Sequence, residues 1–206
     1  IITVLSNKGI ENNDEEICDI CESVASMLRY STSTLKPSAT IEEEIEHVRN
    51  YLVLMKKRYE HRLEFEIDIA KSIYKQPIPK IVLQQIVENS VNHGFKNGQK
   101  VVKIQIKGYL LNGWWYIDFI DNGLGFEEHI LSELKIKMEL MRKEIMEGAN
   151  KTGLAIGGMG IINTFARLLL FYNNEFDFKI KNLECGGAQA TIGSTMKCFE
   201  EEEKSC

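Results

Sequence analysis

The sequence lacks the features that mark several large classes of protein. No apolar run approaches the roughly 20 residues of a membrane-spanning helix, and no block of Lys or Arg stands out against the net charge of −5. We therefore expect no nucleic-acid partner and no direct membrane contact from this segment. The chain opens IITVLSNKG without an initiator Met, so we expect it to be a piece of a longer protein.

Cysteine is scarce and does not form a recognisable framework. The five cysteines are scattered and no signal-peptide pattern precedes them, so a reducing, cytoplasmic setting fits better than a disulfide scaffold. Cys18 and Cys21 form a CxxC, but no second CxxC or nearby His pair completes a zinc site. Both lie in the pattern of a helix expected over 14–31, which favours core packing over metal or redox chemistry.

The composition that remains is that of a globular protein. Apolar residues make up 44% and charged residues 27% of 206 positions, enough for one domain or a domain with an appendage. After the helix over 14–31, a second helix is expected from Thr40, which can cap a first turn rich in acids. Periodicity alone leaves open whether these helices pair with a partner subunit or pack on the same domain.

From Leu63 onward the pattern changes to alternation. LEFEIDI, VVKIQIKGYL and WWYIDFI read as strands, and the last two flank Asn112-Gly113, a strong hairpin signal. Pro79 is expected to start a helix over 81–95. Helices over 127–147 and 161–171 and the strands EFDFKI and AQATIGSTM complete the chain. Because each strand has one apolar face, we predict a two-layer α/β sandwich with a mixed, mostly antiparallel sheet and helices on one face.

The helix over 81–95 carries a dense polar line opposite its apolar stripe. Gln85, Asn89 and His93 follow one another every four residues and therefore stack on one face. Asn is a poorer helix former than Lys or Glu, so its presence favours a function. A carboxamide oxygen can bind Mg²⁺ without repelling a polyphosphate, and Asn92 and His93 could donate to phosphate oxygens.

Three glycine-marked loops interrupt the pattern. In DNGLG, Asp121 follows a strand and can accept a hydrogen bond from an exocyclic amine, while the glycines let a flat ring approach; an ordinary turn is the commoner reading. GGMG, residues 157–160, precedes a helix, where exposed amides form an anion site or a hinge. Gly186-Gly187 precedes the last strand and alone reads as a turn.

Taken in order, these motifs resemble the GHKL (Bergerat) ATP-binding fold. VENSVNHG looks like its N box, DNGLG its G1 box, GGMG its G2 box and GGAQATI its last glycine box. A closer resemblance is to the YesM/LytS type of bacterial sensor histidine kinase. It rests on LRYS, a Glu-rich helix with NYL, and IPKIVLQQIVENSVNHG, against a family pattern of roughly LQ-x-x-VENA-x-x-HG. This resemblance covers about residues 23–196.

The resemblance implies ATP and Mg²⁺ as cofactors. Asn89 would be the Mg²⁺ ligand, Asn92 and His93 would lie near the phosphates, and Asp121 would bind the adenine amino group. The glycines implied in ATP binding are Gly123, Gly125, Gly158, Gly160 and Gly187. The stretch from Glu127 to Gly157 corresponds to the mobile ATP lid.

Some positions depart from the family pattern. Ala188 stands where the family usually has Thr, and Asn92 where many relatives have Lys; Thr191 is expected on the opposite strand face and cannot replace the missing hydroxyl. Gln85 occupies the position of the water-activating Glu of gyrase-like relatives. Glu88 is expected to have a structural role rather than that of a general base, so no catalytic residue is identified.

None of the four histidines fits the family's phosphoacceptor pattern P-H-F-x-x-N. His47, His61 and His129 are expected to be solvated surface residues. The resemblance thus implies a protein-histidine kinase whose acceptor His lies upstream, and a fragment that cannot autophosphorylate. The implied division is 1–36 as a remnant of a dimerisation and phosphoacceptor domain, 37–61 as a connecting helix, 62–197 as the catalytic domain and 198–206 as an acidic tail.

The implied partners are a response regulator and, in the full-length protein, a second copy of the chain. The implied setting is a cytoplasmic domain of a parent protein anchored in the cell membrane. One alternative is a nucleotide-binding interaction module on the same fold that has lost catalysis, with Ala188 and Asn92 as its signature. An anti-sigma-type serine kinase is a third option, which the long helical segment before Leu63 disfavours.

Overall fold

The computed structural model describes residues 2–32, 37–96, 98–146 and 160–197. The helices are α1 (Ile2–Glu11), α2 (Glu15–Thr32), α3 (Ile41–Tyr59), α4 (Val82–Lys96), α5 (Glu128–Met146) and α6 (Gly160–Tyr172). The strands are β1 (Ser38–Thr40), β2 (Leu63–Ile69), β3 (Pro77–Pro79), β4 (Val102–Leu111), β5 (Trp114–Asp121), β6 (Phe176–Asn182) and β7 (Ala188–Thr195). Short 3₁₀ turns span Glu60–Arg62 and Lys71–Ile73.

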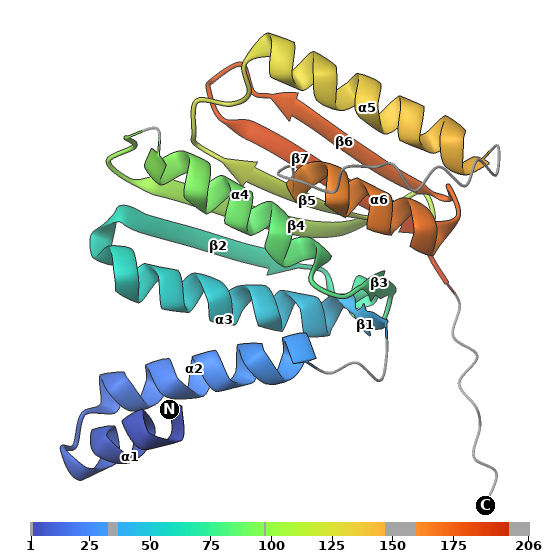
Figure 1. Cartoon of the computed structure of the whole chain (residues 1–206). Coiled ribbons are helices and arrows are strands. Elements are labelled where there is room, and N and C mark those ends of the chain that lie inside the picture. Colours follow the sequence, from blue (N-terminus) through green and yellow to red (C-terminus); the bar gives the residue numbers. More distant parts are fainter. Residues whose placement is uncertain (1, 33–36, 97, 147–159, 198–206) are drawn as a thin grey trace, which may run out of the picture.

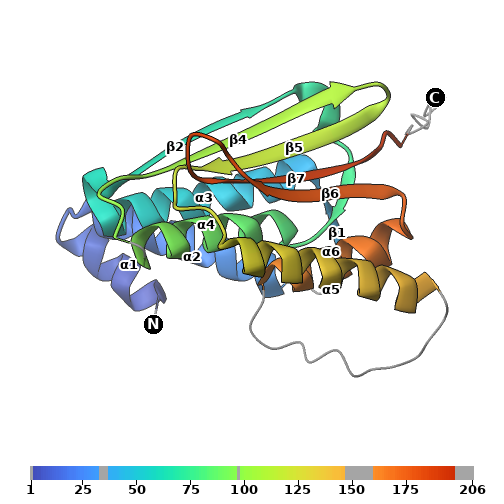
Figure 2. The same cartoon turned by 90° about the horizontal axis from the view of Figure 1, so that it is seen from above.

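A five-stranded sheet in the order β2-β4-β5-β7-β6 forms one layer of the molecule. β2 pairs with β4 in parallel, and the other neighbours are antiparallel. β4 and β5 form the expected hairpin. Asn112 and Gly113 take φ values of 52° and 78°, and a two-residue type I′ turn requires positive φ at both positions. Helices α3, α4, α5 and α6 cover one face of this sheet (Figures 1 and 2). The predicted two-layer sandwich is therefore confirmed.

Helix α3 shares one hydrophobic core with the sheet and α4. Ile41, Val48 and Leu52 are fully buried in that core, so α3 packs on the same domain. The expected cap is present: the Glu43 N–H donates to the Thr40 hydroxyl (3.2 Å) and the Thr40 N–H donates to the Glu43 carboxylate (2.8 Å). This reciprocal pair satisfies amides that the first turn of a helix leaves open.

The prediction that Pro79 starts a helix is wrong. Pro79 ends strand β3, whose partner is β1, and its Cα lies opposite Ser38. Helix α4 begins three residues later at Val82, after Ile81 has turned the chain with a φ of 63°. A proline tolerates the edge of a small ladder as well as a first helical turn, so its position in the sequence did not distinguish the two.

Helices α1 and α2 form a hairpin that lies outside the sheet and beside α3 (Figure 1). A Cβ on Gly9 would lie 2.9 Å from the Cys18 sulfur, which shows how closely the two helices pack. Cys21 is 6% exposed, as expected for a core cysteine, whereas Ile17 and Leu28 of the same predicted stripe are exposed. Of the helices in the described ranges, none has the length and apolarity to cross a membrane.

Candidate functional site

A pocket opens between α4, the loop after β5, and the starts of α6 and β7. The atom-free space in and around it is about 600 Å³, part of which is open solvent. The lining residues are Ile86, Asn89, Ser90, His93, Gly94, Phe119, Asp121, Gly123, Leu124, Gly125, Phe126, Ile161, Ala188 and Ala190. Polar groups therefore converge at a few points on an otherwise apolar wall.

Asp121 is fixed at the end of β5 by three hydrogen bonds. Its Oδ1 accepts the N–H groups of Gly123 (2.9 Å) and Ala188 (3.3 Å). Its Oδ2 accepts the hydroxyl of Ser90 on α4 (3.1 Å). Because each carboxylate oxygen has two lone pairs, Oδ2 retains capacity for a donor on a ligand in the pocket.

The loop after Asp121 is held at both ends by asparagine side chains. Asn122 accepts the Lys103 N–H (2.7 Å) and donates to the Val101 carbonyl (3.0 Å). Asn182, in β6, accepts the Phe126 N–H (2.7 Å) and donates to the Phe126 carbonyl (2.8 Å). These four hydrogen bonds fix the position of the loop. Asn182 could not be predicted from the sequence, since its partner Phe126 lies on a distant segment.

Two glycines of the predicted set stand where a side chain cannot fit. Gly187 has a φ of 94°, and a Cβ there would lie 2.0 Å from the Asp121 carbonyl oxygen. Gly125 has a φ of 75°, and its Cβ would lie 2.6 Å from the Asn182 Oδ1. The absence of side chains lets the loop and the start of β7 approach each other beside Asp121.

Asn89 lies against the first residue of α6. A Cβ on Gly160 would meet both the amide nitrogen (3.0 Å) and the amide oxygen (3.1 Å) of Asn89. The Asn89 amide nitrogen is buried and has no hydrogen-bond partner within the described ranges, so this nitrogen is not committed to a contact with those residues. One turn earlier, the Thr164 hydroxyl donates to Gln85 (3.1 Å) and ties α6 to α4.

The structure brings most, but not all, of the predicted residues together. Asn89, His93, Asp121, Gly123 and Gly125 line one pocket, with Gly160 against Asn89 and Gly187 against Asp121. Asn92 is exposed on α4 and does not line the pocket. Gly158 lies outside the described residues, as does the later part of the expected lid; the earlier part is helix α5.

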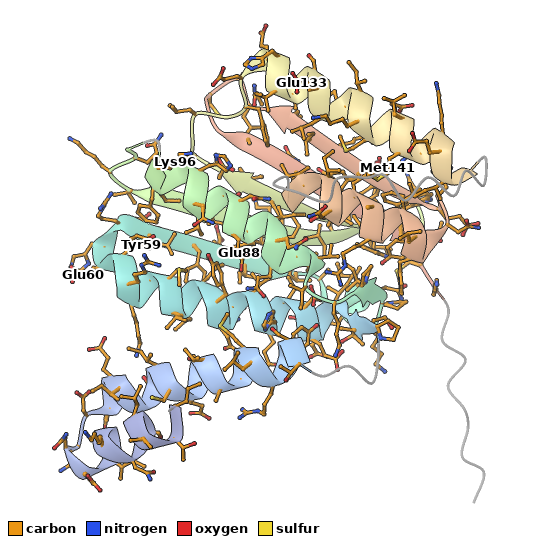
Figure 3. All side chains as sticks on the ribbon, viewed as in Figure 1. Tyr59, Glu60, Glu88, Lys96, Glu133 and Met141 are labelled. Atoms are coloured by element: carbon orange, nitrogen blue, oxygen red, sulfur yellow. The ribbon has the colours of Figure 1, made fainter. Side chains whose placement is uncertain are left out.

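The departures from the family pattern can now be placed. Ala188 lines the pocket, whereas the Thr191 hydroxyl donates to Asp118 (2.6 Å) and does not reach it, as expected from strand alternation. Glu88 lies on the side of α4 that faces α3 (Figure 3), where it accepts the Gln84 amide (2.5 Å). A general-base position in this pocket is therefore not available to Glu88.

Helix α4 is anchored at its other end by a buried carboxylate. Glu44, fully buried on α3, accepts the N–H groups of Ile81 (2.6 Å) and Leu83 (3.2 Å). It also accepts the hydroxyl of Tyr30 from α2 (2.5 Å). Burial raises the pKa of Glu44, while its hydrogen bonds and the charge of Arg167 lower it in part. Burial and the adjacent Glu44 raise the pKa of Tyr30.

His47 corrects a second prediction, because it is buried rather than solvated. Only 3% of its surface is exposed, and its ring stacks on Tyr30 with centroids 4.3 Å apart. Burial lowers the pKa of His47, and the neighbouring Gln84 amide opposes part of the shift. Tyr30, Glu44 and His47 therefore form a polar junction of α2, α3 and α4, remote in sequence from the pocket residues.

Comparison with known proteins supports the motif reading. A family model described as Histidine kinase matches residues 2–63. The sensor histidine kinase YesM of Bacillus subtilis (strain 168) is 32% identical over 120 residues, covering 58% of this chain and 21% of YesM. The sensor protein LytS of Enterococcus faecalis (strain ATCC 700802 / V583) is 26% identical over 206 residues, covering 98% of this chain and 31% of LytS.

A solved structure shares the fold. The crystal structure of full-length ShkA in complex with AMPPNP gives a TM-score of 0.50 at 13% identity, covering 93% of this chain and 39% of ShkA. At this identity the likeness to ShkA shows the fold alone, and it agrees with the two-layer α/β sandwich described above. YesM and LytS are both described as sensor proteins, and the similarity of this chain to them confirms the resemblance that its motifs indicate. The chain spans less than a third of the length of these two relatives.

Proposed function

We propose that this chain binds Mg-ATP in the pocket between α4 and β7 and acts as the catalytic domain that transfers the γ-phosphoryl group to a histidine of its parent protein. The observation that carries the proposal is the convergence of Asn89 and Asp121 on one pocket. A carboxamide stands near the helix N-terminus of α6, and a fixed carboxylate stands beside β7. ShkA, which shares the fold, is described as a complex with AMPPNP.

The carboxylate side of the pocket suits an adenine base. Asp121 would accept the exocyclic amine on Oδ2, while Gly123 and Ala188 hold its other oxygen. Apolar side chains such as Phe119 and Ile161 line the pocket and would cover the faces of the ring. A half-buried acceptor that is held in place in this way favours a base with an amine and disfavours one with a carbonyl at the same place.

The carboxamide side suits the metal and the phosphates. Asn89 has an uncommitted amide and would supply a neutral oxygen ligand to Mg²⁺, which prefers oxygen and shares substrate phosphates. The amides at the start of α6 would face the phosphates, since the N-terminus of a helix favours anions. Among the lining residues that the structure describes there is no Lys or Arg, so Mg²⁺, when bound, would supply much of the positive charge that phosphoryl transfer needs.

Calorimetry with ADP and Mg²⁺ tests the binding half of the proposal. Asp121→Asn replaces an acceptor with a donor next to the amine and should weaken ADP binding by at least about 30-fold. Asp118→Asn is the matched control, because Asp118 lies on the same strand but contacts Tyr109 and Thr191 away from the pocket. Equal affinities of the two variants would contradict the assigned pocket.

The metal assignment has its own readout in the same assay. Asn89→Ala should remove most of the difference between ADP binding with Mg²⁺ and with EDTA, while leaving the binding in EDTA nearly unchanged. This separates loss of a ligand from a general loss of the pocket. An unchanged Mg²⁺ dependence in Asn89→Ala would exclude Asn89 as the ligand.

The transfer half is tested in the full-length parent protein. Incubation with γ-labelled ATP should give an acid-labile phosphate on a histidine, and Asp121→Asn should abolish it. Binding without label would instead favour the interaction module that has lost catalysis, for which Ala188 and Asn92 are the motivating departures.

We also propose the domain division and partners that the family resemblance implies. In this proposal α1 and α2 are the remnant of the dimerisation segment, residues 37–61 connect it to the catalytic domain at 62–197, and 198–206 form an acidic tail. The exposure of Val4, Leu5 and Ile10 on α1 supports contact with a second copy in the parent protein. A response regulator would then receive the phosphoryl group.

A further inference from the structure

Ser90 is a polar residue of the pocket to which neither the motifs nor the proposed function assigned a role. It follows Asn89 on α4, lines the pocket, and donates its hydroxyl to Oδ2 of Asp121 (3.1 Å). Among the lining residues that the structure describes, Ser90 alone carries a hydroxyl. The opposite wall presents only the methyl groups of Ala188 and Ala190.

The chemistry of the position matches one edge of adenine. That edge carries an amine, which donates, next to a ring nitrogen, which accepts. Asp121 supplies an acceptor, and the Ser90 hydroxyl beside it can donate or accept by rotation. While the hydroxyl donates to Asp121, its oxygen can accept from a water molecule that donates to the ring nitrogen, so the pair complements the amine and the ring nitrogen together. Asp121 alone would complement the amine only.

The surrounding contacts explain why the hydroxyl belongs to Ser90. Oδ1 of Asp121 is occupied by two backbone amides, so Oδ2 is the oxygen that Ser90 and a ligand share. The hydroxyl at 191 is engaged by Asp118 and does not line the pocket. Ser90 and Ala188 both contact Asp121 and both line the pocket. Ser90 thus supplies a hydroxyl beside Asp121, where Ala188 has none.

We propose that Ser90 is a base-recognition residue: its hydroxyl donates to Asp121 and accepts from a water molecule that in turn donates to the ring nitrogen next to the amine of adenine. The proposal rests on the function proposed above, because it assumes that the pocket holds a purine nucleotide. It adds that the preference for adenine over a base with a carbonyl at the same position depends on Asp121 and Ser90 together.

The test compares ADP with inosine diphosphate, which has a carbonyl in place of the amine. The wild-type chain should prefer ADP, and Ser90→Ala should weaken ADP binding about tenfold while changing inosine diphosphate binding less than about twofold. A general disturbance of α4 would weaken both ligands equally. Thr191→Val, which removes a hydroxyl outside the pocket, should change neither. Urea unfolding of Ser90→Ala verifies that the variant is folded.

A second variant tests whether the hydroxyl itself is what matters. Adding Ala188→Thr to Ser90→Ala returns a hydroxyl to the pocket from the β7 side and should recover most of the preference for ADP. Equal losses for both ligands, or no loss for either, would overturn the role of Ser90 while Asp121→Asn still abolishes binding. If the wild-type chain binds no purine nucleotide, the proposed function fails and this inference fails with it.

Discussion

Gly187 has no side chain, and the backbone of Asp121 occupies the space where one would begin. The distance of 2.0 Å from a Cβ to the Asp121 carbonyl oxygen is far below any real contact, so Gly187→Ala must displace β7 or the loop. We expect it to lower the free energy of unfolding by about 3 kcal/mol or more, through overpacking plus backbone strain. Urea unfolding provides the measurement.

Gly113 is the matched control for this substitution. It also has a positive φ, 78°, but nothing lies within 4 Å of its Cβ position. Gly113→Ala should therefore cost only the backbone strain, about 1 kcal/mol. Similar losses for the two variants would mean that Gly187 does not approach Asp121 as closely as the structure has it.

Individual pocket residues differed in how far the sequence could predict them. Asn89 can be recognised from the sequence because Asn is an unusual choice for a helix surface. Asp121 can be recognised because it follows a strand and precedes two glycines. Ser90 and Asn182 were not, because they act through partners 31 and 56 positions away. Serine and asparagine are ordinary residues in a helix or at a strand end, so only the folded arrangement reveals their contacts.

Helix α4 owes its position to a cap that comes from another helix. Glu44 accepts two of the amides at its N-terminal end and the hydroxyl of Tyr30. Glu44→Gln places an amide donor opposite one of these donors, so we expect a loss of about 2–3 kcal/mol in the free energy of unfolding. Tyr30→Phe removes one hydrogen bond and leaves both amides capped, so the expected loss is about 1–2 kcal/mol. Urea unfolding of both variants tests the ranking.

Hydrogen exchange distinguishes the two variants by location. Tyr30→Phe should accelerate exchange mainly in α2, which loses its link to α3, whereas Glu44→Gln should also accelerate the first turn of α4. Uniform acceleration in both proteins, or a larger loss of stability in Tyr30→Phe, would contradict the assignment of Glu44 as the cap.

Whole elements were predicted well where the signal was local. The capping residues at Thr40, the alternation from Leu63 and the Asn112-Gly113 turn each depend on neighbours within a few positions. The β1–β3 ladder was missed because its three-residue strands are too short to show a period, and Pro79 was misassigned for the same reason. Helix α1 buries only Gly9 among its residues, and that glycine packs against Ile17 and Cys18 of α2.

Helix α4 joins two regions of the molecule. One is the pocket between α4 and β7, and the other is the junction of Tyr30, Glu44 and His47 at the meeting of α2, α3 and α4. Helix α4 belongs to both, since Glu44 caps its first turn and Asn89 and Ser90 lie further along it. Both regions therefore contact the same helix.

The buried His47 should make the stability of the whole fold depend on pH. Because burial lowers its pKa below the ordinary 6.5, the unfolded chain binds the proton more tightly than the folded one. The free energy of unfolding should then fall as the pH drops through 6.5 toward the folded pKa. Glu44 acts in the opposite sense, since its raised pKa favours the folded state at pH values below that pKa, so the two effects partly cancel in the wild-type protein.

A variant that keeps the stacked ring without the titration separates the two effects. His47→Phe should preserve the contact with Tyr30. Its stability relative to wild type should be constant near pH 8 and should increase as the pH falls from about 7 to about 5.5. Gly113→Ala, which lies away from His47 and Glu44 in the β4–β5 turn, should follow the wild-type trend over the same range. A constant difference between wild type and His47→Phe across these pH values would show that His47 is not held neutral, and the buried junction would have to be reassigned.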